Sequence, residues 1–195
     1  MKPDRPTLRL IACSLAGAAM LAACASQPDR FYTLSALPDS SPAPRSLPTT
    51  EVILSVSIPA VVDRRAMVLA TSRDQVTILE HERWAAPLSD LLAQSLARDI
   101  ERRRADVLVA ERGLSSGSLP VKIRIDVVQF SARRSGSATL EAHWRIVDAR
   151  SKSDETGGEV FMAPITGDDY AAVARAFSVA LSSLADRLVE KLHAR

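Results

Sequence analysis

The sequence predicts an α+β domain, with a mostly antiparallel sheet and two amphipathic helices packed on one face of that sheet. Several short segments alternate apolar and polar residues, which is the two-residue period of a half-buried strand. Two longer segments, beginning near Leu88 and Asp168, repeat apolar residues every three or four positions, as a helix with one buried face does. We therefore expect the sheet to have one covered face and one polar face.

The chain begins with the features of a bacterial lipoprotein signal. Three basic residues within the first nine positions precede an apolar run over residues 10–23. Leu21, Ala22 and Ala23 stand before Cys24 and match a lipobox, in which the cysteine thiol takes a diacylglyceryl group and the peptide is cleaved just before it. We expect residues 1–23 to be a signal peptide, 24–30 a lipidated tether and 31–195 the folded domain.

The two alternatives for this segment are a membrane-spanning helix and lipidation at Cys13. The apolar run is about 14 residues long, shorter than the roughly 20 that a membrane-spanning helix needs. Cys13 also follows a lipobox-like triplet, but only three residues separate it from Arg9, which leaves no room for an apolar signal core. Because Cys13 is removed with the signal, the mature chain keeps one cysteine and forms no internal disulfide.

The expected mature chain carries no net charge. Residues 1–23 contain three basic residues and one acidic residue, so their removal takes the formal charge from +2 to zero. This balance argues against nucleic acid as a partner, because nucleic acid calls for a strongly basic face. Ala25 follows Cys24 where an aspartate typically retains lipoproteins at the inner membrane. The expected location is the periplasmic face of the outer membrane.

The first half of the domain reads as strands followed by one helix. The predicted strands are an edge strand at 31–34, a half-buried strand at 52–58 and a hairpin formed by 67–71 and 76–80, with a proline-rich loop at 38–50. A helix follows, with Pro87 at its first position and an apolar stripe through Leu88, Leu92 and Ile100. The three arginines at 102–104 suit the carboxyl end of this helix.

The second half of the domain also consists of strands followed by one helix. We expect strands at 107–110, 121–127, 140–146 and 159–165, with a polar hairpin tip at 131–137 and a turn ending at Gly157 and Gly158. Asp168 and Asp169 open the final helix, whose apolar positions continue to Leu192.

Four segments together resemble the ABC-type transport auxiliary lipoproteins, the PqiC family, and the likeness runs in order across nearly the whole mature chain. They are Phe31-Tyr32-Thr33-Leu34, Ile58-Pro59-Ala60, Val62-Asp63-Arg64 and Arg83-Trp84-Ala85-Ala86-Pro87-Leu88. The resemblance implies an outer-membrane lipoprotein that works with a mammalian-cell-entry (MCE) domain protein and an inner-membrane ABC permease and ATPase in lipid transport. Because MCE proteins form hexamers, it also raises the prospect of a homo-oligomer. Around Val62 and Arg65 this chain departs from the family pattern.

No motif supports catalysis or a cofactor. Ser115 lies in a Gly-x-Ser-x-Gly pattern, but the esterase elbow needs a helix directly after the serine, and here Pro120 leads into a strand. The three histidines are scattered and give no metal-ligand spacing. A glycine-rich phosphate loop is absent from the sequence, so this chain is not the ATPase of a transporter.

Three residues are candidates for contact with a partner or with lipid. Arg133 and Arg134 at the predicted hairpin tip could meet head groups or an acidic partner, or could simply be solvated. Trp84 could touch a partner, or could lock the start of the first helix together with Pro87. An alternative function is a periplasmic lipid carrier, with an apolar pocket between sheet and helices that accepts an acyl chain.

Overall fold

The computed structural model describes residues 27–36, 50–110, 119–134 and 136–193. Cys24, the lipobox and Ser115 lie outside these residues. The elements in chain order are β1 (Arg30–Tyr32), β2 (Thr50–Ser57), β3 (Ala66–Ala70), β4 (Val76–Trp84), α2 (Leu88–Arg103), β5 (Val107–Ala110), β6 (Val121–Ala132), β7 (Ser137–Asp148), β8 (Ser153–Pro164) and α3 (Tyr170–His193).

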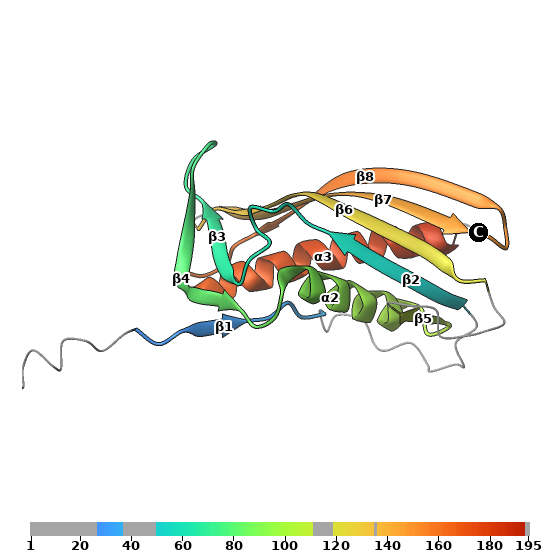
Figure 1. The fold of residues 1–195 in the computed structure, drawn as a ribbon, viewed down its shortest axis with the longest axis horizontal. Helices are drawn as coiled ribbons and strands as arrows, with labels where there is room; N and C mark the ends of the chain where they lie inside the picture. The colour runs from blue at the N-terminus through green and yellow to red at the C-terminus, as the bar shows by residue number, and fades with distance from the viewer. Residues whose placement is uncertain (1–26, 37–49, 111–118, 135, 194–195) are drawn as a thin grey trace, which may run out of the picture.

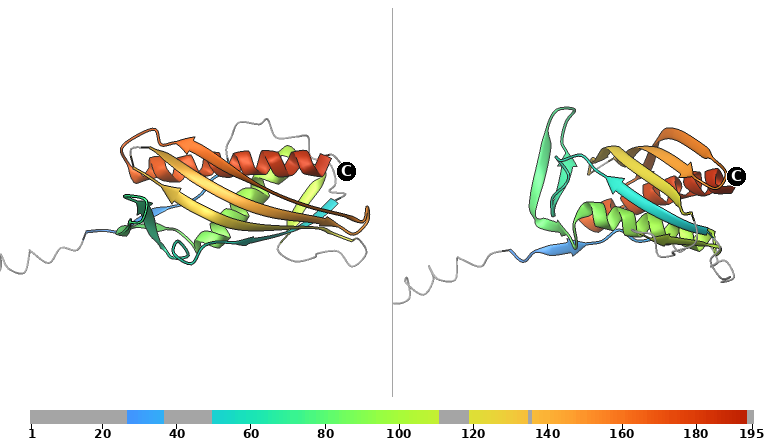
Figure 2. Two further views of the ribbon diagram at one scale, coloured as in Figure 1. Left: turned by 90° about the horizontal axis from the view of Figure 1, so that it is seen from above. Right: turned by 45° about the vertical axis from the view of Figure 1, so that its right-hand side comes forward.

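The α+β class is confirmed, and antiparallel pairings join most of the paired residues. The strands form two sheets, one of five strands in the order β5-β2-β6-β7-β8 and one of three in the order β1-β4-β3 (Figure 1). β6, β7 and β8 are antiparallel, whereas β2 runs parallel to both of its neighbours and β1 runs parallel to β4. The helices lie on one face of the larger sheet, α2 against β2 and β5, and α3 against β7 and β8 (Figure 2).

The single sheet expected from the sequence is divided because the chain turns sharply after β2. Pro59 cannot donate a ladder hydrogen bond, and its carbonyl accepts the backbone N–H groups of Val62 and Asp63 in a tight turn. The following β3–β4 hairpin leaves the plane of the larger sheet and stands at one end of the molecule (Figure 1). β1 lies on the outer edge of the smaller sheet, as the sequence predicted.

Both helices begin and end close to their predicted bounds. Pro87 is the N-cap of α2 rather than its first helical residue, and its carbonyl accepts the N–H groups of Asp90 and Leu91. The α3 helix is capped by the Asp169 carboxylate, which accepts the N–H of Ala172 at 2.8 Å. The apolar stripes of both helices are buried against the sheet and against each other, and together with the inward-facing side chains of the strands they form the core.

The predicted turn at Gly157 and Gly158 is wrong, because both glycines lie inside β8. The turn lies further back, between β7 and β8, and Lys152 adopts a φ of 56° there. Gly157 pairs with Trp144, and a Cβ added at Gly157 would stand 2.6 Å from the Trp144 ring. Glycine is therefore required so that the indole can lie against the strand, which is a packing role rather than a turn role.

An aromatic cluster joins the two sheets to α3. Trp84 at the end of β4 is 2% exposed, and its ring packs edge-on against Phe130 of β6 and Phe177 of α3, with centroid distances of 6.3 and 6.4 Å. Phe130 and Phe177 stack at 3.7 Å. The smaller sheet is thus held to the rest of the domain by a shared core.

Candidate functional site

The three candidate contact residues lie in different surroundings. Trp84 is buried against Phe130 and Phe177, so its side chain is not accessible to a partner. Arg134 donates to the Asp168 carbonyl at 3.0 Å and to the Tyr170 hydroxyl at 3.3 Å, and its guanidinium lies over the Tyr170 ring. Both Arg133 and Arg134 are exposed, and Arg134 holds the start of α3 through these contacts.

Between the sheet and the helices, the described residues form a continuous hydrophobic core. A hollow of about 190 Å³ lies where α2 meets β2 and β5, lined by Leu54, Ala93, Gln94, Ala97, Val109 and Ala110. Ligand pockets usually measure roughly 300–1,000 Å³. This hollow is therefore small for an acyl chain, and it gives the lipid-carrier alternative little support.

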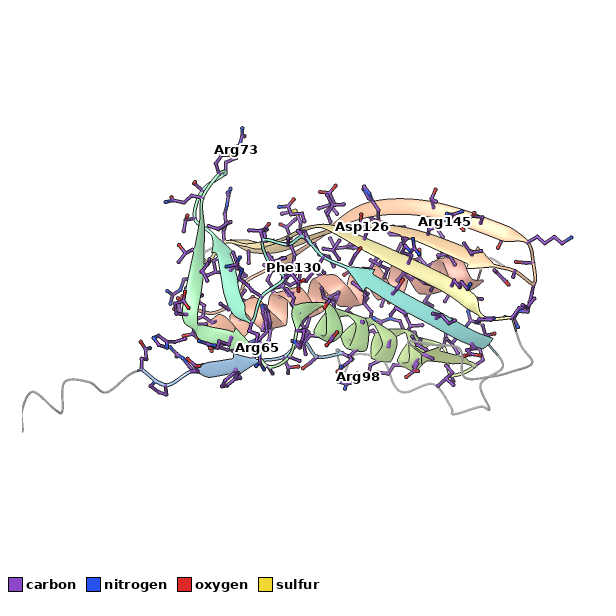
Figure 3. All side chains as sticks on the ribbon, viewed as in Figure 1. Arg65, Arg73, Arg98, Asp126, Phe130 and Arg145 are labelled. Atoms are coloured by element: carbon purple, nitrogen blue, oxygen red, sulfur yellow. The ribbon has the colours of Figure 1, made fainter. Side chains whose placement is uncertain are left out.

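A larger hollow lies on the opposite, helix-free face of the five-stranded sheet, which we call the outer face. A groove of about 640 Å³ crosses β6, β7 and β8 and carries Arg124, Asp126, Glu141, His143 and Arg145. Figure 3 shows Asp126 and Arg145 on the side of the sheet away from the helices. The residue at 158 is a glycine, and a Cβ there would stand 2.4 Å from the His143 ring, so the imidazole occupies the space above it.

The outer face contains an ion pair between neighbouring strands. The Arg145 guanidinium donates two hydrogen bonds to the Asp154 carboxylate, at 2.8 and 2.5 Å. This contact holds the pKa of Asp154 below its usual range and raises the pKa of Arg145. Asp126 accepts a hydrogen bond from the Ser57 hydroxyl at 2.8 Å. The sequence predicted a polar face here but gave no signal that its residues line a groove.

A second cluster of charges links α2 to α3, with Asp99 buried at its centre and Asp186 exposed at its edge. Asp99 has a fully buried side chain and accepts a hydrogen bond from Arg103 at 2.9 Å. Arg103 also donates to Asp186 and to the hydroxyl of Ser182 on α3. Burial raises the pKa of Asp99, and the hydrogen bond from Arg103 acts in the opposite direction. This cluster links the helices and is closed to ligands.

In the described ranges no three histidine, cysteine, aspartate or glutamate side chains converge in a way that could hold a metal ion. Neither helix in that part of the chain has the length and apolar character needed to cross a bilayer.

Comparison with known proteins gives a family and a fold. The model of a family described as "ABC-type transport auxiliary lipoprotein component" matches residues 32–189. The crystal structure of an uncharacterized protein aligns with a TM-score of 0.72 and 16% identity, covering 85% of this chain and 99% of that one. The crystal structure of a protein from Xanthomonas campestris aligns with a TM-score of 0.64 and 22% identity, covering 82% and 92%. At these identities the two structures show the fold alone. No curated protein sequence matches the chain.

Proposed function

Because the chain belongs to the family of ABC-type transport auxiliary lipoprotein components, we propose that it is a non-catalytic docking module anchored by Cys24 to the periplasmic face of the outer membrane. Its partner would be an MCE-domain protein, together with an inner-membrane ABC permease and ATPase that move lipids between the membranes. Assembly of several copies into a ring is part of the same proposal. The observation that carries it is the family match beginning eight residues after a lipobox cysteine.

The length of the tether supports an orientation of the domain on the membrane. Six residues after Cys24 the chain enters β1 at Arg30, and an extended chain spans at most about 3.5 Å per residue. β1 would therefore lie within roughly 20 Å of the lipidated residue. The β3–β4 hairpin stands at the same end of the molecule, and the β7–β8 turn lies at the opposite end (Figure 1). In this orientation the β7–β8 turn projects into the periplasm.

Replacing Cys24 by alanine is expected to release the protein from the outer-membrane fraction. The thiol is the proposed site of the diacylglyceryl group, and one apolar run of about 14 residues is too short for a stable span. Sucrose-gradient fractionation of cell envelopes measures how the protein is distributed between the outer-membrane, inner-membrane and soluble fractions. Cys13→Ala is the matched control, since it removes a cysteine from the signal peptide and should change nothing. An unchanged membrane fraction for Cys24→Ala would overturn the anchor.

A photocrosslinking amino acid at Arg150, in the β7–β8 turn, is expected to capture the MCE-domain partner in intact cells. Arg150 is exposed and lies at the end of the domain away from the tether. The matched position is Arg73, at the tip of the β3–β4 hairpin (Figure 3), where capture should be much weaker. Mass spectrometry of the crosslinked bands identifies the partner. The docking role is refuted if neither position captures an MCE-domain protein. The proposed orientation is refuted if Arg73 captures more of that protein than Arg150 does.

A further inference from the structure

Six outward-pointing side chains on three neighbouring strands form a small hollow next to the groove. It measures about 250 Å³, and the six side chains are those of Ile53 and Ser55 of β2, Lys122 and Arg124 of β6, and Arg145 and Val147 of β7. The lining also includes Ile123 of β6, whose side chain is buried in the core. The strand register places the outward-pointing side chains in two rows across the sheet. Ile53, Lys122 and Val147 form one row, and Ser55, Arg124 and Arg145 form the next. We call this hollow the cationic hollow.

The charged side chains that line the cationic hollow are all positive. Three of its seven lining residues are basic and no carboxylate lines it. Arg124 and Arg145 are direct cross-strand partners, an arrangement that destabilises a sheet when both residues carry the same charge. Asp154 neutralises Arg145 from the side of β8. Within the described ranges, neither Lys122 nor Arg124 forms an ion pair with a carboxylate, so both keep their charge available for a ligand.

We propose that the cationic hollow binds the phosphate group of a phosphate ester. A guanidinium presents a planar fork of N–H donors that matches phosphate oxygens, and Lys122 adds a flexible point charge on the same side. The exposed Ser55 hydroxyl is a further donor in the row of Arg124. Ile53 and Val147 are half-buried and give the adjoining row an apolar surface for the organic part of the ester.

The position of the acidic residues confines the anion to one end of the outer face. Arg124 and Arg145 line both the cationic hollow and the neighbouring groove, but Asp126 and Glu141 line only the groove and disfavour an anion there. The site does not depend on the proposed docking role, because all of its residues belong to one copy of the chain. It can therefore be tested on the isolated protein, without a partner.

The test is an NMR titration of the purified full chain in non-ionic detergent at low salt. Inorganic phosphate and dihexanoyl phosphatidylglycerol are added separately, with sodium chloride at equal ionic strength as the blank. We expect the backbone amides of Ser55, Arg124 and Arg145 to shift in a saturable way. Arg124→Gln is expected to weaken binding at least fivefold. Because Arg124 is exposed and faces a like charge, this variant should fold as well as the natural chain.

Arg73→Gln is the matched control, since it removes one positive charge at the hairpin tip, away from the hollow (Figure 3). Shifts with both compounds support a general phosphate site. Shifts with phosphatidylglycerol alone support a lipid head group held partly by Ile53 and Val147. Shifts with inorganic phosphate alone would overturn the assignment to an ester, because the site would then bind only free phosphate. The proposal is overturned if neither compound shifts these amides beyond the chloride blank. It is also overturned if Arg73→Gln weakens binding as much as Arg124→Gln.

Discussion

Trp84→Ala is expected to lower the free energy of unfolding by about 3–5 kcal/mol, the usual cost of removing a large aromatic side chain from a core. The indole is 2% exposed and contacts Phe130 and Phe177, so its loss leaves a cavity where the two sheets and α3 meet. The smaller sheet is a separate hydrogen-bonded unit of β1, β4 and β3, and Met67 and Leu69 of β3 join the same core beside Trp84. We expect the β3–β4 hairpin to lose its fixed position as well.

Urea denaturation followed by circular dichroism measures this effect without relying on the fluorescence of the residue that is removed. Phe31→Ala is the matched control, because Phe31 is an aromatic residue of the same small sheet but is 59% exposed. Its loss should cost well under 1 kcal/mol, as surface substitutions usually do. A Trp84→Ala variant as stable as Phe31→Ala would show that the cluster does not hold the sheets together.

The helices and hairpins were predictable because their signals are local. The stripe from Leu88 to Ile100 and the alternation from Val121 to Val127 each lie within a dozen residues, and a buried face leaves such a pattern wherever it packs. The predicted bounds of the helices are confirmed to within a few residues. Cys24 and its lipobox are also a local signal, and their role stays a prediction.

The strand pairings of the larger sheet, the role of Gly157 and the cationic hollow depend on contacts between residues far apart in the sequence. Strand β2 pairs with β6 and β5 in parallel, across more than fifty residues of chain, and nothing near Val52 specifies those partners. Gly157 looks like a turn residue until Trp144 is placed opposite it. The cationic hollow arises only when the register sets Arg124 beside Arg145, so the alternation of Lys122 and Arg124 predicts an exposed face but not a site.

Arg103→Ala is expected to lower the free energy of unfolding at neutral pH by about 3–5 kcal/mol, because it leaves a buried carboxylate without its partner. Asp99 is fully buried, and Arg103 is the residue that joins it to Ser182 and Asp186 on α3. Arg98→Ala is the matched control on the same helix. Arg98 is exposed (Figure 3), and alanine is at least as good a helix former as arginine, so little should change.

The cost of Arg103→Ala should also depend on pH in a defined direction. Burial already raises the pKa of Asp99, and removal of the Arg103 hydrogen bond raises it further. A carboxyl whose pKa is higher in the folded state stabilises the fold when protonated, and that stability is lost as the pH rises through the folded-state pKa. The stability difference between Arg103→Ala and the natural chain should therefore shrink as the pH is lowered from 7 towards 4. Adding Asp99→Asn to Arg103→Ala should recover most of the loss at pH 7 and remove this pH dependence. A deficit that is the same at both pH values, with no recovery in the double variant, would mean that Arg103 acts through packing rather than through the charge of Asp99.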